Sequence, residues 1–326
     1  MLEDVAAVVT AYRPGGGLVP LVRALLAQVA VVVVVDDTGA GLDASSAVLA
    51  EVEAAGALVV RHATNRGIAT NRGIAAALNT GIAAALDSGI AGAHDSGAAP
   101  SASAGGLRFV VTFDQDSAID DGFVAALVTT ADQATAAGFA VGLVAPATVE
   151  GLPSQVTGRS RGFLLGSTPI QSGMLLPVGT LRRVGAFAEE LFIDGVDTDY
   201  ALRVTAAGLR VLVADRTTLH HSLGDRFTPS ILGRPLSTGA AGGFVVSRPF
   251  RYYYLLRNRV LLNRRHARGD RAWSIRATFG DLRHCAIVLV IAPGRRARLR
   301  AMTAGLRDGW AGRTGRIPTP LERRLP

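Results

Sequence analysis

The stretch Phe109-Val110-Val111-Thr112-Phe113-Asp114-Gln115-Asp116-Ser117 gives the strongest indication of the fold, because an apolar, β-branched run ends abruptly at two carboxylates. Such a run predicts a buried strand, and the polar residues mark its carboxyl end. Side chains two positions apart on an extended chain point the same way, so Asp114 and Asp116 can face one hard cation. Taken alone, the pair can also form a turn or a helix N-cap, and this alternative stays open.

The segments around this strand alternate between strand-like and helix-like patterns. We expect strands at 5–10, 31–35 and 58–61, with helices at 18–28 and 45–55 between them. Farther along, we expect a helix at 123–138, strands at 140–145 and 209–214, and a loop or β-ribbon at 148–166. This alternation predicts an α/β fold with a mainly parallel central sheet that helices cover on both faces.

Polar residues follow three of the predicted strands. They are Thr10-Ala11-Tyr12 after the first, Asp36-Asp37 after the second and Asp114-Gln115-Asp116 after the fourth. Ligands of open α/β sheets bind beyond the carboxyl ends of the strands. We therefore expect these three strand ends to meet at one ligand site.

The segment from Asn71 to Gly81 predicts a close approach of the chain to the sheet. Gly73 allows unusual backbone angles, and the small residues that follow allow a helix to pack tightly. The segment fits a ligand loop, and it also fits a tightly packed helix with a polar cap. Residues 87–106 repeat Asp-Ser-Gly and then become rich in Ala, Ser, Gly and Pro, which predicts a flexible surface insertion.

An acidic segment opens a predicted helix near residue 196. Asp199 and Arg203 are four residues apart, as in a helical ion pair, and acids favour a helix N-terminus. This explanation does not require Asp194 and Asp197, so one of the two remains a candidate general base. The pair His220-His221 follows another predicted strand, from which a third metal ligand could join the aspartates, although most such pairs are merely polar surface or core residues.

Charge is unevenly distributed along the 326 residues. Residues 251–326 contain 18 arginines and four acids, a net +14, which leaves −6 for residues 1–250 within the total of +8. This excess suits a partner rich in phosphate. Arg257, Arg264, Arg268 and Arg271 would share one helix face as far as Gly269 allows the helix to persist.

Other features of the composition exclude some classes of protein. The single cysteine, Cys285, rules out an internal disulfide and a cysteine-based zinc site. The acidic start and the absence of an apolar run of about 20 residues predict neither a signal peptide nor a membrane-spanning helix. We therefore expect a cytoplasmic protein.

In this order, the motifs resemble those of family 2 glycosyltransferases with the GT-A nucleotide-diphospho-sugar transferase fold, and in particular bacterial rhamnosyltransferases. The resemblance runs from Val5 to about Gly315. It rests on these segments: Thr10-Ala11-Tyr12, Val35-Asp36-Asp37, Asn71-Arg72-Gly73 through Asn79-Thr80-Gly81, Asp114-Gln115-Asp116-Ser117, Leu191-Phe192-Ile193-Asp194 through Asp197 and Arg203, His221-Ser222-Leu223-Gly224, Arg251-Tyr252-Tyr253 and Arg257-Asn258.

The resemblance implies a role for each matching residue. The nucleotide-sugar site would comprise Thr10, Tyr12, Asp36, Asp37, Asn71, Gly73, Asp114 and Gln115. A divalent cofactor, Mg²⁺ or Mn²⁺, would be held by Asp114, Asp116 and His221, with Asp116 as the direct ligand. Asp197 would be the general base, with Asp194 as the alternative, and the acceptor or its diphosphate would meet Asp194, Arg203, Arg257 and Asn258.

The resemblance also implies an activity and a domain plan. We expect a catalytic domain at 1–248, containing the insertion, and a basic, mostly helical segment at 249–326. The activity would be inverting transfer of a deoxysugar, such as L-rhamnose from a dTDP donor, to a polyprenyl-diphosphate-linked or growing glycan acceptor at the inner face of the plasma membrane. Arg13, Asp37 and Val196 depart from the family pattern, which leaves the nucleobase contacts and the base open.

Other functions remain possible from the sequence. The same family also uses other donors, including galactofuranose and UDP-linked sugars. A catalytically silent protein that binds an anionic membrane or nucleic acid would account for the arginines, but the three aspartates Asp114, Asp116 and Asp197 count against it, and we expect no nucleic acid partner. A nucleotidyltransferase is disfavoured because lysine, the phosphate ligand of the usual Gly-rich phosphate loop, is missing from the sequence.

Overall fold

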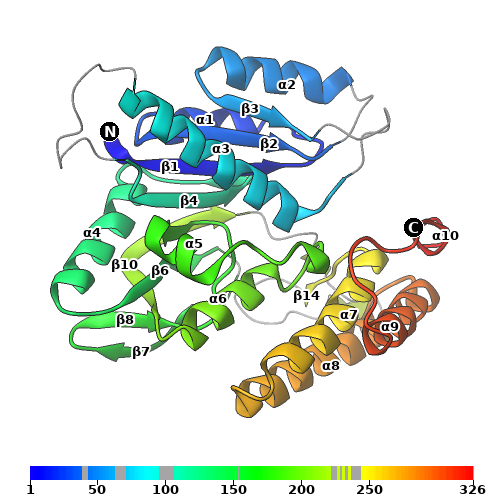
Figure 1. Cartoon of the computed structure of the whole chain (residues 1–326). Helices are drawn as coiled ribbons and strands as arrows, with labels where there is room; N and C mark the ends of the chain where they lie inside the picture. The colour runs from blue at the N-terminus through cyan, green and yellow to red at the C-terminus, as the bar shows by residue number, and fades with distance from the viewer. Residues whose placement is uncertain are drawn as a thin grey trace. The chain divides into compact units, whose positions relative to one another are not determined.

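A computed structural model describes residues 1–38, 43–62, 71–94, 106–150, 152, 154–221, 226–227, 230–231, 234–235 and 244–325 (Figure 1). The chain divides into two compact units. Unit 1 comprises Met1–Ala188 and Val196–Ser222, and unit 2 comprises Glu189–Gly195 and Leu223–Pro326. The short segment Glu189–Gly195 therefore belongs with the C-terminal part of the chain.

Unit 1 is built on a ten-stranded mixed sheet with the order β3-β2-β1-β4-β9-β6-β10-β8-β7, in which β5 also pairs with β10. Neighbouring strands are parallel from β3 to β4 and between β6 and β10, while β9 runs antiparallel between β4 and β6. The strands are β1 (Leu2–Ala11), β2 (Val29–Asp36), β3 (Leu58–Arg61), β4 (Phe109–Asp114), β5 (Ser117–Ala118), β6 (Val141–Val149), β7 (Val156–Ser160), β8 (Phe163–Gly166), β9 (Met174–Pro177) and β10 (Arg210–His221).

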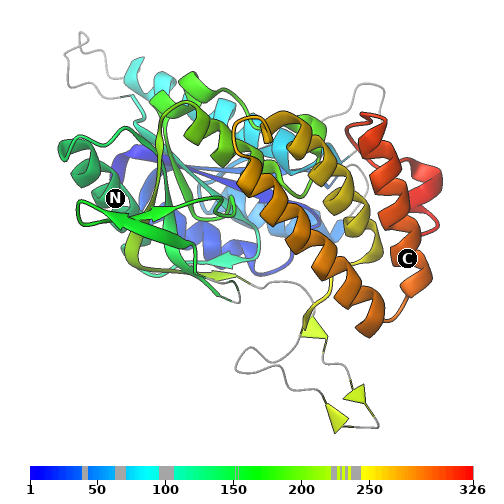
Figure 2. The ribbon, with the colours of Figure 1, turned by 90° about the horizontal axis from the view of Figure 1, so that it is seen from below.

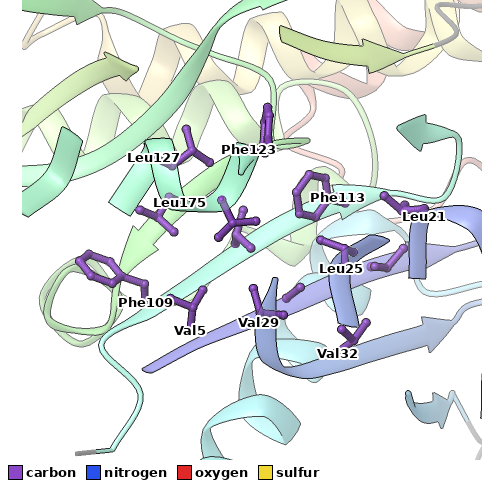
Figure 3. Close-up of a cluster of buried hydrophobic side chains, with 14 of the residues drawn as sticks. Val5, Leu21, Leu25, Val29, Val32, Phe109, Phe113, Phe123, Leu127 and Leu175 are labelled. Carbon is purple, nitrogen blue, oxygen red and sulfur yellow. The ribbon is translucent and has the colours of Figure 1, made fainter. Parts of the chain in front are cut away.

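Helices cover this sheet, and their apolar faces complete the core. They are α1 (Leu18–Leu26), α2 (Asp43–Ala54), α3 (Ile74–His94), α4 (Phe123–Ala136), α5 (Val178–Val184) and α6 (Val196–Ala206). Figure 3 shows part of the core, where Leu21 and Leu25 of α1 and Phe123 and Leu127 of α4 approach the strand residues. Val5, Val29 and Phe113 are among those strand residues and are completely buried. Both faces of the sheet are covered by helices. This explains why its strands are nearly continuous runs of valine and other apolar residues.

Helix α3 packs closely on the sheet at Gly81. A Cβ atom there would lie 2.4 Å from Val8 Cγ1 and 2.9 Å from Val35 Cγ2, so only glycine fits without a shift. The prediction that small residues bring this helix close to the sheet is confirmed. The predicted insertion at 87–106 is wrong in its first part, because α3 continues to His94 with good helix formers such as Ala91 and Ala93. Its remainder at 95–105 lies outside the described residues.

Unit 2 contains a 3₁₀ turn, η1 (Glu189–Leu191), and the helices α7 (Pro249–His266), α8 (Arg271–Ile291), α9 (Arg295–Trp310) and α10 (Thr319–Glu322). Helices α7, α8 and α9 pack against one another (Figure 2). Two short strand pairs precede them: β11 (Arg226–Phe227) with β14 (Phe244–Val245), and β12 (Ser230–Ile231) with β13 (Arg234–Pro235). Close packing of α7 on α9 depends on Gly305, where a Cβ would lie 2.3 Å from the Tyr253 carbonyl oxygen.

The structure confirms the predicted α/β class, the central sheet flanked by helices and the helical C-terminal extension. The predicted ribbon within 148–166 is present as the antiparallel pair of β7 and β8. The helix does not persist across Gly269, so Arg268 and Arg271 do not continue the expected arginine face of Arg257 and Arg264. Helix α7 ends at His266, and Asp270 caps a separate helix, α8, by accepting from the Trp273 amide at 2.8 Å. None of the described helices is long and apolar enough to cross a membrane.

Candidate active site

The carboxyl ends of β1, β2 and β4 lie side by side. Thr10 of β1 pairs with Val35 of β2 on one side and with Asp114 of β4 on the other, and Ala11 pairs with Asp36. The three predicted polar strand ends therefore meet at one edge of the sheet, as expected for a ligand site of an α/β fold.

Asp114 is fixed by side chains from two other segments. Its Oδ1 accepts hydrogen bonds from Gln171 Nε2 at 2.5 Å and from Thr10 Oγ1 at 3.3 Å. Its backbone N–H donates to Ser172 Oγ at 3.1 Å, and Ser172 Oγ also lies 2.7 Å from Ser117 Oγ. Because Gln171 and Ser172 are buried, the orientation of Asp114 is set before any ligand arrives.

Asp116 differs from Asp114 in its surroundings, because it is exposed and lies in a turn. Strand β4 ends at Asp114, so the alternation of an extended chain does not extend to Asp116, and that part of our sequence argument is wrong. After the turn, Ser117 pairs with His221 of β10 in antiparallel register. The backbone of His221 is therefore next to the turn, whereas its side chain lies outside the described residues.

Gln115 and Tyr12 connect the ends of β4 and β1. The Tyr12 amide donates to Gln115 Oε1 at 2.8 Å, and Gln115 Nε2 donates to the Tyr12 carbonyl at 3.0 Å. This pairing occupies the Gln115 amide and leaves Tyr12 44% exposed at the site edge. The Arg13 guanidinium lies 5.3 Å from the centre of the Tyr12 ring, and the predicted contact of Tyr12 with a nucleotide stays a prediction.

The two aspartates after β2 have different surroundings. Asp36 is half-buried and its Oδ1 accepts from the Thr38 amide at 3.0 Å, which forms a local turn. Asp37 is buried, with Oδ1 2.9 Å from His62 Nδ1, and it accepts from the amides of Arg72 and Gly73 at 2.8 Å each. Asp37 thus holds the start of the 71–81 segment against the end of β2.

Asn71 and Gly73 form the tight turn that leads into α3. The Gly73 N–H also donates to Asn71 Oδ1 at 2.9 Å, and Gly73 has a φ of +92°, which glycine adopts without strain. The other ring nitrogen of His62, Nε2, lies 2.8 Å from Thr80 Oγ1 of α3. The turn is therefore fixed at both sides, and the predicted contact of Asn71 and Gly73 with a nucleotide sugar stays a prediction.

Helix α6 carries the candidate base. Asp197 is half-buried in its first turn, and its Oδ1 accepts from the Thr198 amide at 2.7 Å. The predicted pair of Asp199 and Arg203 is present, with Arg203 Nε donating to Asp199 Oδ2 at 2.8 Å. Arg203 also donates to the carbonyls of Val184 and Ala186, so its guanidinium links α6 to the end of α5.

In unit 2, the segment before α6 is held by α7. Asn258 Nδ2 donates to the carbonyls of Leu191, Ile193 and Asp194 at 2.7–2.9 Å, and Asp194 pairs with Arg251. Asp194 has a φ of +62° and Phe192 one of +65°, which is unusual for residues other than glycine. The Asn258 amide stabilises this strained backbone by donating to three of its carbonyls.

Arg257 is completely buried beside this segment. Its guanidinium donates to the carbonyls of Leu191 and Gly315 and to Asn258 Oδ1, and it stacks on the ring of Tyr254 at 4.9 Å. Burial lowers the pKa of Arg257 from its ordinary value. These contacts give Arg257 and Asn258 partners within the protein, and their predicted contact with an acceptor stays a prediction.

The side chains at the strand ends fit a divalent cation of the Mg²⁺ type. Such an ion takes one or two carboxylates together with water and substrate phosphates, and Asp114 and Asp116 are two hard oxygen donors at a single turn. Among the described side chains, no group of three or more His, Cys, Asp or Glu is arranged to hold a metal without other ligands. Binding of a divalent ion by Asp114, Asp116 and His221 therefore stays a prediction.

Sequence reasoning missed the residues that orient these groups. Gln171 and Ser172 precede β9, and His62 follows β3, but none of them was expected at the site. A signal for the first two is the polar Gln171-Ser172-Gly173 immediately before an apolar strand. Gly173, with a φ of +78°, turns the chain so that its amide donates to the Thr112 carbonyl at 2.7 Å.

Comparison with curated protein sequences gives one relative. No family model matches the chain. The chain is 29% identical over 156 residues to the dTDP-rhamnosyl transferase RfbF of Shigella flexneri, a match that covers 46% of this chain and 49% of the relative. The chain thus spans about half the length of the curated relative that it matches.

Solved structures with some likeness are more distant. One is GalNAc-T7 with UDP, GalNAc and Mn²⁺, at 12% identity and a TM-score of 0.47, covering 67% of this chain and 43% of that one. A mycobacterial protein matches at 16% identity and a TM-score of 0.41, covering 67% of each chain. Mannose-1-phosphate geranyltransferase from Thermus thermophilus matches at 15% identity and a TM-score of 0.35, covering 67% of this chain and 76% of that one.

The protein is thus a mixed α/β protein with a polar site at the carboxyl edge of its sheet. In sequence it resembles glycosyltransferases, and more particularly a rhamnosyltransferase.

Proposed function

We propose that the protein is an inverting glycosyltransferase of the GT-A type that transfers a deoxysugar, L-rhamnose from a dTDP donor, to a lipid-linked or growing cell-surface glycan. The observation that carries this proposal is Asp114, fixed by Gln171 and Thr10 at the strand edge with Asp116 exposed on the adjoining turn. A carboxylate pair in that place could hold a divalent cation that would in turn bind a nucleoside diphosphate. The choice of donor is supported by the similarity to the dTDP-rhamnosyl transferase.

In the proposed reaction, the acceptor hydroxyl attacks the anomeric carbon as the bond to the diphosphate breaks. Asp197 takes the proton of the hydroxyl, and a single displacement inverts the anomeric centre. The proposed Asp-x-Asp motif, Asp114-Gln115-Asp116, would hold Mg²⁺ or Mn²⁺ with His221, and that ion would neutralise charge on the leaving diphosphate. Tyr12 and Asp36 would contact the nucleoside, while the clamp between Gln115 and Tyr12 would fix the pocket edge.

We also propose that the acceptor is a polyprenyl-diphosphate-linked glycan and that the protein works in the cytoplasm at the inner face of the plasma membrane. The net charge of +14 in residues 251–326 supports this location, because arginines favour anionic lipid headgroups and diphosphates. The aspartates of the site favour this reading over a catalytically silent binding protein.

The test is a panel of sugar nucleotides, each incubated with the protein with and without Mg²⁺ or Mn²⁺, and release of nucleoside diphosphate is measured. We expect release from a dTDP-deoxysugar that depends on the metal. Asp116→Ala is expected to lower turnover about 100-fold or more, because diphosphate charge is left unscreened. Asp121→Ala, at another exposed aspartate, is the matched control and is expected to keep full turnover.

The same panel separates the alternatives. Release only from a UDP-linked sugar would keep the class of enzyme and replace the donor. Release from none of them, with or without an added glycan acceptor, would contradict the proposed reaction.

A further inference from the structure

Helix α8 of unit 2 presents an apolar stripe to solvent. Ile275 is 70% exposed, Phe279 67%, Leu282 50% and Val290 67%. With Ala286, which is also exposed, these residues follow one another at intervals of four, three, four and four, so they share one helix face. Trp273, Cys285 and Val288 of the same helix are buried in unit 2. The helix therefore has two apolar faces, and only one of them is covered.

Arginines lie beside the exposed stripe. Arg271, Arg276 and Arg283 are all exposed and occupy adjoining positions on the helix surface. The acid of α8, Asp281, pairs with Arg259 of α7 at 2.6 Å, and its side chain is only 18% exposed. Just beyond the helix, Arg295 donates to the Val290 carbonyl at 2.5 Å, which keeps a further cation at the end of the stripe. Among its described residues, the exposed face of α8 thus combines apolar side chains with positive charge alone.

We propose that this face of α8 is an interfacial membrane anchor that lies in the plane of an anionic bilayer. The whole of α8 is not amphipathic, because its other face is also apolar and is buried in unit 2. Its exposed half sets Phe, Leu and Ile beside arginines, and these are the side chains that interfacial helices present to a bilayer. Its 21 residues span roughly 31 Å, and the helix does not qualify as a membrane span, so it suits a position along the surface. Anionic headgroups neutralise the arginines while Phe279 and Leu282 enter the acyl boundary.

Charge also argues against a second copy of the chain as the occupant. A two-fold contact between two α8 faces would bring the same patch of each copy together, and thus arginine against arginine. An anionic lipid surface satisfies the apolar stripe and the arginines together. This inference rests on the proposed function, because a lipid-linked acceptor requires the enzyme to work at a membrane.

The test is co-sedimentation of the full chain with vesicles of phosphatidylcholine alone or mixed with phosphatidylglycerol, at low and high salt. We expect partition into the anionic vesicles that falls as salt rises. The double variant Phe279→Ser/Leu282→Ser is expected to lower the partition coefficient at least about tenfold. Arg276→Ser/Arg283→Ser is expected to lower it about fivefold per arginine at low salt and much less at high salt.

Leu58→Ser is the matched control, because Leu58 is an exposed leucine of unit 1. It is expected to leave the partition unchanged, and circular dichroism should show the same thermal unfolding for every variant. Wild-type partition by the Phe279→Ser/Leu282→Ser variant would overturn the proposal. Sedimentation velocity showing a dimer that this variant dissolves, without binding to vesicles, would also overturn it and assign the face to a second copy.

The vesicle assay requires neither donor nor acceptor, so its result is independent of the transfer reaction. Asp116→Ala is expected to bind vesicles as the wild type does. For the wild-type protein, vesicle binding without release of nucleoside diphosphate would contradict the proposed reaction alone, and release without vesicle binding would contradict the anchor alone.

Discussion

The two carboxylates of the Asp114-Gln115-Asp116 segment have different surroundings. Asp114 is oriented by Gln171, Thr10 and the turn before β9, whereas Asp116 is exposed on the turn itself. A fixed acceptor next to an exposed one suits an ion that brings part of its own coordination shell. Gln171 is therefore expected to set the orientation of Asp114, and thus the geometry of the proposed ion site, without contacting the ligand itself.

Gln171→Leu tests this positioning role. The change removes the amide that donates to Asp114 Oδ1, a hydrogen bond to a charged group, and such bonds contribute about 1.5–3 kcal/mol. We expect nucleoside diphosphate release to fall about tenfold or more, together with a higher metal concentration at half-maximal rate. Gln133→Leu, on the exposed face of α4, is the control. An unchanged metal dependence in Gln171→Leu would show that this bond does not position the site.

Two substitutions decide whether Asp197 or Asp194 is the general base. Asp197→Asn keeps the acceptor for the Thr198 amide but removes the group that takes a proton, so donor binding should persist while transfer falls by orders of magnitude. Asp194→Asn should keep more activity, because Asp194 is engaged with Arg251 and asparagine tolerates its φ of +62°. The measurements are donor affinity by calorimetry and transfer rate. The opposite ranking of the two variants would make Asp194 the base.

Sequence could predict those site features that depend on local pattern. The strand ends at Thr10, Asp36 and Asp114 follow from β-branched runs that stop at polar residues, and the Asp199–Arg203 pair follows from helical spacing. Gln171 could not be predicted, because 57 residues separate it from Asp114 and the antiparallel insertion of β9 brings the two together. Nor could the direction of Asp116, which depends on the turn that leads to β5.

At the scale of elements, α7 acts as a template for the segment before α6. The Asn258 amide donates to the carbonyls of Leu191, Ile193 and Asp194. The Arg257 guanidinium also donates to the Leu191 carbonyl. Sequence reasoning assigned this helix a basic face because arginines recur along it. Arg257 lies on this helix but is completely buried. The spacing of arginines along a helix therefore predicts which of them share a face, but not whether that face is exposed.

Asn258→Ala should therefore lower the stability of the protein. The change removes the amide that donates to the carbonyls of Ile193 and Asp194 and the oxygen that accepts from Arg257 Nε, while the Leu191 carbonyl keeps Arg257 as a donor. Each buried group left unsatisfied costs about 1–3 kcal/mol, and relaxation recovers part of this cost. We expect the free energy of unfolding to fall by about 2–4 kcal/mol in urea titrations. Arg265→Ala is the control, because its pair with Glu190 at 2.7 Å is partly exposed, at 35% and 41% for the two side chains, and should contribute at most about 1 kcal/mol. Equal effects of the two changes would contradict the template role.

At the scale of the whole molecule, the chain enters unit 2 twice. Residues 189–195 belong to unit 2, although unit 1 precedes and follows them in the sequence. Helix α6 begins at Val196 immediately after this excursion, so the candidate base Asp197 follows directly on a segment that α7 holds. The conformation of residues 189–195 is therefore expected to depend on the rest of unit 2.

Truncation after Arg248 tests that dependence. The shortened chain lacks Arg251, Arg257 and Asn258, so residues 189–195 lose their hydrogen-bonding partners and the backbone angles of Phe192 and Asp194 lose their support. We expect cleavage by a glutamate-specific protease after Glu189 and Glu190 to accelerate at least about tenfold, because local opening then costs less free energy. Cleavage at Glu51 and Glu53 of α2 in unit 1 is the internal control and should keep its rate. Mass spectrometry of the fragments over time gives both rates from one sample, and equal acceleration at the two places would mean that unit 1 unfolds as a whole without unit 2. Unchanged rates at both places would instead show that the segment 189–195 keeps its structure without α7, and would contradict the proposed dependence.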